Sequence, residues 1–274
     1  MAEWLRSGLQ IRVFRFDSGC GLQTFFLVRR CRRGLRMLDA AAGGGYLSGG
    51  CHDEDPEMND FVTARLQMVD NQLRSSNVTD HRILAAMGAV AREAFLPESR
   101  RALAYADVAH KLGEGRYLAP PAPFARLLQL AEIEQTDRIL DVGAGTGYST
   151  AVLARLGAEV TALEPVPELA ASARTCLGAA GVANATVVEA SFAGAGLPER
   201  SFDVVIVEGT VDAEPAELFR LLAEGGRLVC TIGRGGAATA HVFVRSGEEV
   251  AGRSEFNTAL PPLPIASPTE TFVF

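Results

Sequence analysis

The sequence predicts an α/β protein in which a mostly parallel sheet carries helices on both faces and follows a helical region. From Arg138 onward, short apolar runs alternate with amphipathic segments, which is the pattern of strand–helix–strand units. In residues 61–130, by contrast, apolar positions recur at helical spacing. The first predicted strand runs directly into alternate glycines at positions 143, 145 and 147, which favour a loop held against a ligand.

Length and composition limit the classes of protein to consider. A chain of 274 residues is long enough for one large α/β domain with extra segments at its ends. Apolar residues make up 48% and charged residues 22%, as in folded soluble proteins. The net charge of −7 disfavours nucleic acid as the main partner, because Lys and Arg carry phosphate binding. No apolar run approaches the roughly 20 residues of a membrane span. We therefore expect a cytoplasmic protein whose partners are small molecules or other proteins.

Cysteine and histidine residues are spread along the chain without the spacing of a disulfide framework or a metal site. There are five cysteines, with no C-x-x-C pair, and four histidines with no second ligand at metal spacing. We expect reduced thiols, no bound metal and a monomer. The residues are Cys20, Cys31, Cys51, Cys176, Cys230, His52, His81, His110 and His241.

Residues 1–57 differ in character from the rest of the chain. Eight arginines crowd this stretch, which also contains the Ala-Ala-Gly-Gly-Gly run at 41–45 and lacks clean helix or strand periodicity. An Arg-rich start of this kind suits a transit peptide or a basic arm. Met58, however, stands where a predicted amphipathic helix opens. We expect residues 1–57 to be disordered and dispensable, with Met58 as the natural initiator.

The next region, 58–130, is predicted to be helical with one long irregular loop. A helix starts near Met58, a second follows Thr79 as its cap, and the third covers 124–130. Residues 105–123 between the last two contain Gly113, Gly115 and several prolines. A loop of this length inside a compact domain is usually functional.

Residues 131–274 are predicted to form the sheet domain. An antiparallel edge is expected from 242–245 and from a segment near Phe256 or at 272–274. The central strands are expected at 139–142, 160–163, 186–188, 204–207 and 228–232, and the helices at 149–156 and 167–179.

The glycine loop and the carboxylates around it predict which cofactor the protein binds. Glu164 ends the second strand, twenty-one residues after Gly143, a spacing that suits a carboxylate accepting hydrogen bonds from ribose hydroxyls. Dinucleotide sites have the spacing G-x-G-x-x-G, whereas this loop is G-x-G-x-G and places Tyr148 where the third glycine would be needed. Asp141 would repel a pyrophosphate but would favour the cationic methionine end of S-adenosylmethionine.

We therefore predict a Rossmann-like, class I S-adenosylmethionine-dependent methyltransferase fold. The alternatives are a nicotinamide or flavin dinucleotide and a glycine turn without a ligand. Glu189 ends the third strand near the expected adenine position. Glu208 ends the fourth strand beside the reaction centre, although a solvated or structurally paired glutamate suits the pattern equally. The expected cofactor-binding residues are Asp141, Gly143, Ala144, Gly145, Thr146, Gly147, Tyr148, Glu164, Pro165, Glu189 and Ala190.

Over residues 60–235 the sequence resembles the protein-L-isoaspartate (D-aspartate) O-methyltransferases. The resemblance implies a substrate loop opening at Gly113-Glu114-Gly115, S-adenosylmethionine as cofactor, and isoaspartyl residues of damaged proteins as substrates in their repair. The motifs that carry it are Met68-Val69-x-x-Gln72-Leu73, Asp80-x-x-Ile83-Leu84-x-Ala86-Met87, Arg92-Glu93-x-Phe95-Leu96-Pro97 and Ala104-Tyr105-x-Asp107.

The substrate loop departs from the family pattern. Where the family typically continues as Gln-Thr-Ile-Ser-Gln-Pro, this chain has Arg116-Tyr117-Leu118-Ala119-Pro120-Pro121, so two hydroxyl residues are replaced. The family's Gly-Asp-Gly after the third strand is likewise Ala190-Ser191-Phe192. Arg116 is a candidate to pair with a substrate carboxylate and Tyr117 to donate a hydrogen bond, although both suit ordinary loop positions as well.

Methyl transfer to a carboxylate needs no general base, because the carboxylate is ionised at neutral pH. Catalysis is then mostly a matter of positioning, and a lost loop hydroxyl lowers the rate without changing the reaction. We expect Arg116, Tyr117 and Glu208 to lie at the reaction centre of an isoaspartyl methyltransferase. A methyltransferase for a small-molecule acceptor and a non-catalytic relative that binds the cofactor are the alternatives.

Overall fold

The computed structural model describes residues 11–16, 24–31, 34–39, 56–234 and 237–263. The chain divides into two compact units, Met1–Asp53 and Glu54–Phe274. The described part of the first unit is an antiparallel sheet in the order β1 (Ile11–Phe16), β2 (Thr24–Cys31) and β3 (Gly34–Asp39). These strands were not expected from the sequence. The other residues before Pro56 lie outside the described residues. Disorder of residues 1–57 and a natural start at Met58 therefore stay predictions.

Removing residues 1–53 is expected to leave the thermal stability of the second unit unchanged, within about 2 °C. The reason is that contacts cluster within each of the two units, so the second one has a hydrophobic core of its own. Thermal unfolding followed by circular dichroism of the full and shortened chains would check this. A drop of more than about 4 °C, the size of a loss of at least 1 kcal/mol in a domain of about 150–250 residues, would contradict it.

The second unit begins with a helical region, as predicted. The second predicted helix starts one residue later than expected, because Asp80 and not Thr79 is its cap: the Asp80 carboxylate accepts a hydrogen bond from the Arg82 amide at 2.7 Å. The elements are α1 (Pro56–Met68), a π-helical turn η1 (Val69–Leu73), 3₁₀ turns η2 (Arg74–Ser76) and η3 (Arg92–Phe95), α2 (His81–Ala89) and α3 (Glu98–Arg101).

The loop predicted at 105–123 contains a short hairpin of β4 (His110–Gly113) and β5 (Arg116–Leu118). Its turn has left-handed backbone angles at Gly113, Glu114 and Gly115, with φ of 126°, 48° and 71°. Helix α4 (Pro121–Leu130) follows and starts three residues before the predicted 124, with Pro121 at its first position, where no amide hydrogen is needed.

The sheet of the second unit has the order β12-β11-β10-β9-β6-β7-β8. Strands β10, β9, β6, β7 and β8 are parallel, while β11 and β12 form an antiparallel edge. The strands are β6 (Arg138–Val142), β7 (Glu159–Leu163), β8 (Ala185–Val188), β9 (Phe202–Val211), β10 (Leu222–Arg234), β11 (Ala237–Ser246) and β12 (Glu249–Asn257), and the helices are α5 (Tyr148–Leu153), α6 (Pro167–Ala179) and α7 (Ala216–Phe219).

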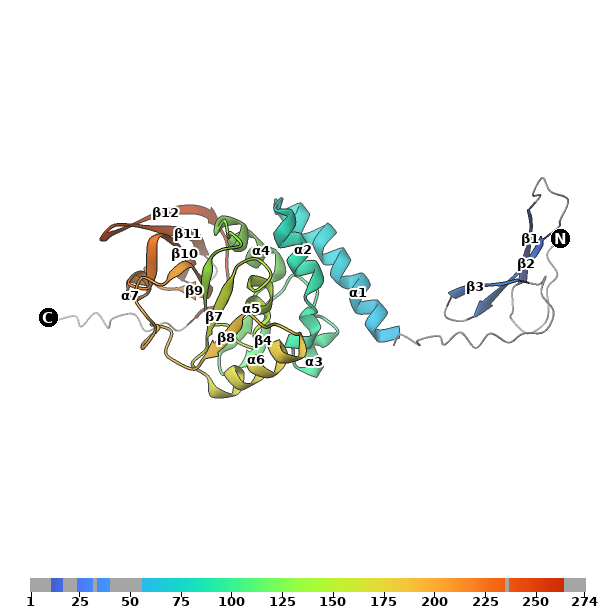
Figure 1. Cartoon of the computed structure of the whole chain (residues 1–274), viewed down its shortest axis with the longest axis horizontal. Helices are drawn as coiled ribbons and strands as arrows, with labels where there is room; N and C mark the ends of the chain where they lie inside the picture. The colour runs from blue at the N-terminus through green and yellow to red at the C-terminus, as the bar shows by residue number, and fades with distance from the viewer. Residues whose placement is uncertain (1–10, 17–23, 32–33, 40–55, 235–236, 264–274) are drawn as a thin grey trace. The chain divides into compact units, whose positions relative to one another are not determined.

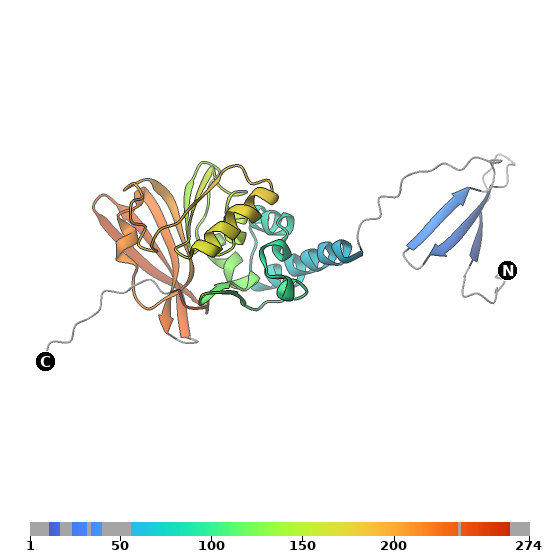
Figure 2. The same ribbon diagram turned by 90° about the horizontal axis from the view of Figure 1, so that it is seen from below.

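The predicted α/β fold is thus confirmed, including the antiparallel edge. Phe256 lies in β12, whereas the alternative edge at 272–274 falls outside the described residues. Figures 1 and 2 show the antiparallel edge, in orange and red, at one end of the second unit and helices α1–α3 at the other.

Residues of the central strands alternate between two apolar clusters, one on each face of the sheet. Ile139 and Val204 belong to the cluster that helices α2, α4 and α5 cover. Leu140 and Val205 belong to the second cluster, which is closed by α7 and the segment around Phe192. The first cluster therefore attaches the helical region, and the hairpin that follows it, to the sheet.

The order in which the parallel strands are added to the sheet reverses between β6 and β9. Strands β7 and β8 extend from one side of β6, while β9 and β10 extend from the other. In the paired register, Asp141 lies beside Ile206 and Val142 beside Val207, so the carboxyl ends of the two strands meet. Ligands of open α/β sheets bind in the crevice at such a reversal.

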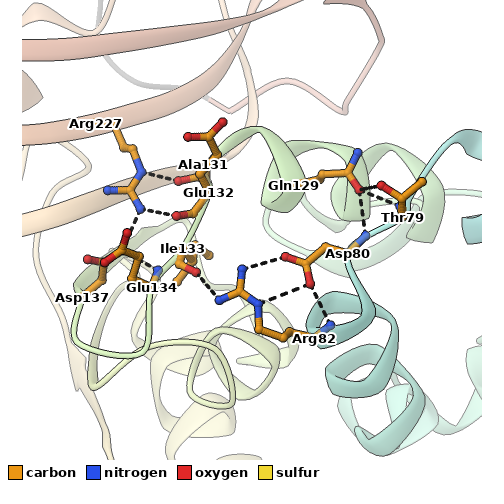
Figure 3. Close-up of polar contacts among 10 residues, drawn as sticks. All are labelled: Thr79, Asp80, Arg82, Gln129, Ala131, Glu132, Ile133, Glu134, Asp137 and Arg227. Carbon is orange, nitrogen blue, oxygen red and sulfur yellow. Dashed lines mark hydrogen bonds and ion pairs between the residues drawn. The ribbon is translucent and has the colours of Figure 1, made fainter.

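The connection from α4 to β6 is held by polar contacts from two distant arginines (Figure 3). Arg227 on β10 donates to the carbonyls of Ala131 and Glu132 and forms an ion pair with Asp137 at 2.7 Å. Arg82 on α2 donates to the carbonyl of Ile133 at 2.8 Å. These contacts fix how α4, and with it the helical region, joins the first strand of the sheet.

Replacing Arg227 with methionine is expected to lower the free energy of unfolding by about 3 kcal/mol, because it leaves the buried Asp137 carboxylate and two carbonyls without their donor. Urea unfolding would measure the loss. Arg253→Met is the matched control, because its ion pair with Glu255 lies on the exposed β12 edge and surface pairs contribute little. Equal losses in the two variants would contradict the anchoring role.

Candidate functional site

The loop after β6 has the shape that the alternate glycines predicted. Gly143, Gly145 and Gly147 have φ angles of 87°, 57° and 93°, in the left-handed region that favours glycine. The Gly143 amide donates to the carbonyl of Leu163 on β7 at 2.8 Å, which ties the loop to the neighbouring strand. Helix α5 starts directly afterwards, at Tyr148.

Side chains of this chain contact the loop where a β-carbon would stand. A β-carbon on Gly143 would lie 2.6 Å from Arg116 Nη2 and 3.0 Å from Leu263 Cδ1, and one on Gly145 would lie 2.8 Å from Leu112 Cδ1. Leu112 and Arg116 belong to the β4–β5 hairpin. Leu263 lies in the segment after β12. Its amide donates to the carbonyl of Thr210 on β9 at 2.8 Å. The hairpin of the predicted substrate loop therefore packs directly on the predicted cofactor loop.

Asp141 lies at the carboxyl end of β6 and is fully buried. Its Oδ2 accepts hydrogen bonds from Ser149 Oγ at 2.7 Å and Thr150 Oγ1 at 2.6 Å, whereas Oδ1 has no partner among the described residues. Burial raises the pKa of Asp141 to about 6, and the bonds from Thr150 and Ser149 oppose part of this shift. An unpaired buried acceptor of this kind fits a ligand that brings a donor or a positive charge.

Glu208 is a second buried carboxylate at the same crevice. Val207 on β9 pairs with Val142 on β6. Glu208 is the next residue after Val207 and therefore lies beside the start of the glycine loop. Its Oε1 is also without a hydrogen-bond partner in the described part of the chain. Burial, followed by the negative charge of Asp141, raises the pKa of Glu208 well above its ordinary range.

Glu164, at the end of β7, is fully buried and makes contacts with both carboxylate oxygens. Its Oε2 accepts from the Gly145 amide at 2.8 Å, and its Oε1 from the Val166 amide at 3.3 Å. The Arg116 guanidinium forms an ion pair with Oε2 at 3.4 Å and donates to the Gly143 carbonyl at 2.6 Å. Arg116 is itself only 2% exposed and lies 5.1 Å over the Phe192 ring. The predicted ribose carboxylate is thus paired with the arginine of the predicted substrate loop.

Thr146 and Tyr148 attach the loop to the helical region. Thr146 Oγ1 donates to the Phe95 carbonyl at 2.6 Å. The Tyr148 ring packs against Phe95 and Phe124 and lies under the Arg92 guanidinium at 4.7 Å, so its side chain is part of the apolar core. Only the backbone of Tyr148 belongs to the crevice.

The other residues predicted for the site lie at its margin. Tyr117 is half-buried on β5, opposite Lys111 in the hairpin. Pro165 is half-buried directly after Glu164, and Ala144 is buried within the loop. Glu189 is exposed at the end of β8, and Ala190 packs against the second apolar cluster.

Sequence reasoning did not single out Ser149 and Thr150, which support Asp141, or Leu112 and Leu263, which pack on the glycines. Two hydroxyl residues directly after a glycine loop were an available signal. Arg92 was not predicted as a site residue either. This fully buried guanidinium donates to the carbonyls of Ala104 at 2.8 Å and Ala119 at 2.5 Å, and so holds both ends of the substrate loop.

We expect the raised pKa of Asp141 to make cofactor affinity depend on pH. Because ionised Asp141 favours a cationic ligand, affinity for S-adenosylmethionine is expected to rise with pH up to about 6 and then level off, with a slope near tenfold per pH unit below it. The stability of the free protein is expected to change with pH in the opposite direction to the affinity. Between 3.8 and about 6 the fold holds a proton that the unfolded chain has lost, so the free energy of unfolding falls as pH rises through this window. Calorimetry and urea unfolding from pH 4.5 to 8 would measure both. An affinity independent of pH would contradict this role.

Other features of the described residues are separate from this crevice. A cavity of about 690 Å³ lies between α5, α6 and the segment 89–95, and none of the predicted site residues lines it. Within the described ranges, no group of three or more His, Cys, Asp or Glu side chains is arranged to hold a metal ion. The helices described here include none that is long and apolar enough to cross a membrane.

The sheet reversal, the glycine loop after β6 and the carboxylate after β7 define a class I methyltransferase that uses S-adenosylmethionine. Within this class, the model of the protein-L-isoaspartate(D-aspartate) O-methyltransferase family matches residues 64–264. The chain belongs to this family, and S-adenosylmethionine is its cofactor. The match includes the β4–β5 hairpin, the helical region from residue 64 onward and the cofactor loop.

Individual relatives agree with this assignment. A protein-L-isoaspartate O-methyltransferase of Koribacter versatilis is 38% identical over 178 residues, which are 65% of this chain and 80% of the relative. One of Methylorubrum populi is 40% identical over 187 residues, 68% of this chain and 87% of the relative.

Two solved structures show the same fold. A protein-L-isoaspartate O-methyltransferase has a TM-score of 0.63 and 24% identity over 73% of this chain and 65% of that one. A Plasmodium falciparum structure bearing the same enzyme name, in complex with S-adenosyl-L-homocysteine, has a TM-score of 0.61 and 20% identity over 73% of this chain and 97% of that one.

Proposed function

We propose that this enzyme methylates the free carboxyl group of L-isoaspartyl and D-aspartyl residues in damaged proteins, the step that initiates their repair. The observation that carries the proposal is the arrangement of residues at the strand reversal. Three carboxylates, Asp141, Glu164 and Glu208, are buried beside the glycine loop, and the hairpin of the family's substrate loop packs on this loop and pairs with Glu164 through Arg116.

The residues of the crevice fit S-adenosylmethionine. Asp141 Oδ1 and Glu208 Oε1 are buried acceptors without partners among the described residues, which suits the ammonium and the other donors of a cationic ligand. Glu164 follows the strand after the glycine loop, the position of the ribose-binding carboxylate in doubly wound folds, which supports it as the acceptor for ribose hydroxyls. We assign the loop 143–148, Pro165, Glu189 and Ala190 to the walls of this site, with the Tyr148 side chain as its support.

When bound, S-adenosylmethionine supplies the methyl group of a sulfonium, and transfer to a carboxylate oxygen yields a neutral methyl ester and the neutral thioether of S-adenosylhomocysteine. The protein need not remove a proton, since the substrate carboxylate is already ionised. Its residues align the substrate carboxylate with the methyl group and exclude water. The negative carboxylate and the positive sulfonium both become neutral in the reaction, and this loss of charge favours a buried site. Glu208 and Asp141 flank this site, and Arg116 and Tyr117 lie on the hairpin that faces it.

A second candidate function keeps the cofactor but changes the acceptor to a small carboxylic acid. Two observations favour it: Ala119 has no hydroxyl group to offer a substrate, and Arg116 is engaged with Glu164 and the Gly143 carbonyl. A relative that binds the cofactor without catalysis is the third candidate.

The test is incubation of the full chain with radiolabelled S-adenosylmethionine and an isoaspartyl peptide, beside the same peptide with a normal aspartyl linkage. Base-labile label in the isoaspartyl peptide alone supports the proposal. Cofactor binding by calorimetry without label in either peptide would point to the other two candidates, which a panel of small acids then separates. Ala119→Ser with Tyr117→Thr restores the family's hydroxyls, and a large gain in peptide labelling would show that the loop limits this activity.

Residues 58–130 are proposed to carry the substrate loop, residues 131–274 the cofactor site, and residues 1–57 a dispensable extension. We also propose that the protein is a cytoplasmic monomer that acts on protein or peptide substrates and not on nucleic acid, which the net charge of −7 supports. Light scattering of the purified protein across a range of concentrations tests the oligomeric state.

A further inference from the structure

We propose that Arg116 is a latch between the two binding sites: it holds Glu164 in the free protein, is released when the cofactor binds, and then holds the carboxylate of the substrate. The inference rests on the proposed function for the identity of the substrate. It makes the cofactor the first ligand to bind.

The first step of the argument is that Arg116 lies in the cofactor crevice of the free protein. Its Nη2 donates to the Gly143 carbonyl at 2.6 Å and forms an ion pair with Glu164 Oε2 at 3.4 Å, and its Nε is also 3.4 Å from this oxygen. The Nη2 atom occupies the space beside Gly143 that a β-carbon would need. With side-chain exposures of 2% and 0%, Arg116 and Glu164 form an ion pair closed off from water.

The second step is competition for one carboxylate. Glu164 Oε2 already accepts from the Gly145 amide, and Oε1 accepts from the Val166 amide. A ribose that donates its hydroxyls to this buried carboxylate has to take the place of the guanidinium. The ion pair is long at 3.4 Å, beyond the usual 2.7–2.9 Å of a strong charge-assisted bond, so the exchange is within reach of a ligand that binds closely.

The third step concerns the anion that the released guanidinium binds. A buried positive charge needs a partner, and the remaining carboxylates nearby, Asp141 and Glu208, are the buried acceptors that we assign to the donors of the cofactor. The substrate brings an ionised carboxylate. Arg116 is the first residue of β5, directly after the left-handed turn at Glu114 and Gly115, so a change in this turn moves it without disturbing the sheet.

The fourth step is that this chain needs such a residue. In the segment 116–121 of this chain, Arg116 is the only charged residue and Ala119 has no hydroxyl group, whereas the resemblance implies a neutral glutamine and two hydroxyls in the family's loop. Arg92 differs from Arg116 because the partners of its Nε and Nη2 are the backbone carbonyls of Ala104 and Ala119, for which the ribose hydroxyls of the cofactor do not compete. Replacement of glutamine by arginine therefore supplies the charge that the altered loop otherwise lacks.

The experiment measures binding by calorimetry with the full chain, using S-adenosylhomocysteine and an isoaspartyl peptide as probes. Arg116→Gln, which introduces the family's residue, is expected to bind S-adenosylhomocysteine about tenfold more tightly than the parent, because no ion pair has to be broken. Its affinity for the peptide at saturating S-adenosylhomocysteine is expected to fall about tenfold. In the parent, the peptide should bind at least about tenfold more tightly with S-adenosylhomocysteine than without it, and this difference should disappear in the variant.

Two further variants make the test specific. Arg116→Lys keeps the charge without the planar fork and should lie between the parent and Arg116→Gln in both affinities. Arg155→Gln removes one positive charge from an exposed position after α5, beside the separate cavity, and should change neither affinity. Thermal unfolding of all four proteins checks that each is folded.

Unchanged or weaker binding of S-adenosylhomocysteine to folded Arg116→Gln would overturn the latch. So would a parent that binds the peptide equally well with and without S-adenosylhomocysteine. A failure of the proposed function has a different signature: S-adenosylhomocysteine binds more tightly to Arg116→Gln, as expected, but no variant binds the isoaspartyl peptide. That result overturns the substrate and supports the hold of Arg116 on Glu164.

Discussion

Replacing Asp141 with asparagine is expected to weaken the binding of S-adenosylmethionine at least about 100-fold while leaving the protein folded. The asparagine oxygen can still accept from Ser149 and Thr150, which now donate to Asp141 Oδ2. Its amide nitrogen then takes the place of Oδ1, the buried acceptor without a partner among the described residues. A donor replaces an acceptor at the point where we place the cationic end of the cofactor.

The stability of this variant should not fall. Because burial raises the pKa of Asp141 to about 6, the ionised carboxylate costs the free protein stability at neutral pH, and a neutral amide removes this cost. The free energy of unfolding at pH 7.5 should therefore equal or exceed that of the parent.

Calorimetry with both S-adenosylmethionine and S-adenosylhomocysteine locates the contact in the ligand. Equal losses for the two ligands place Asp141 at the ammonium that both carry, whereas a larger loss for S-adenosylmethionine places it at the sulfonium. The variant should also lose the dependence of affinity on pH near 6. Binding within about threefold of the parent at pH 7.5 would remove Asp141 from the cofactor site.

Glu164→Gln is expected to lower the free energy of unfolding by about 3 kcal/mol and cofactor affinity at least about tenfold. The loss of stability arises because Arg116, only 2% exposed, is left as a buried positive charge without its carboxylate. The loss of affinity arises because the amide accepts fewer hydrogen bonds from the ribose hydroxyls than a carboxylate.

A double-mutant cycle separates the two effects. Glu164→Gln combined with Arg116→Gln removes both charges and should recover most of the lost stability, because neither buried charge then lacks a partner. The combination should not recover cofactor affinity. Urea unfolding and calorimetry measure the two quantities, and additive losses of stability in the double variant would show that the ion pair contributes nothing.

Much of the fold could be predicted from local pattern. Helix α6 has the predicted bounds of 167–179, and the strands β6, β7 and β8 lie within one residue of their predicted starts. Strands β6 and β7 are mostly buried and read as short apolar runs, and helix α6 has an apolar stripe, so pattern and environment agree. The lengths of β9 and β10 were underestimated, because their ends are set by pairing with each other.

The hairpin inside the substrate loop was missed for a similar reason. Strands β4 and β5 have only four and three residues, too few for a periodic pattern, and they are stabilised by packing on the glycine loop. The cap of α2 was placed one residue early, at Thr79, although both Thr79 and Asp80 have side chains that can cap a helix. The choice follows from Gln129, which is distant in sequence and accepts from the Thr79 amide at 2.7 Å.

By itself, the sequence determined the class of fold, the glycine loop, the carboxylates at the ends of β6 and β7, and the family. The fold, the loop and the carboxylates depend on short segments with a regular spacing, and the family depends on motifs of the helical region. Only the tertiary structure decided which side chains meet: that Arg116 pairs with Glu164, 48 positions later in the chain, and that Tyr148 supports the loop from the core. Contacts of this range depend on how the hairpin packs against the sheet, and burial then decides which charges remain without a partner.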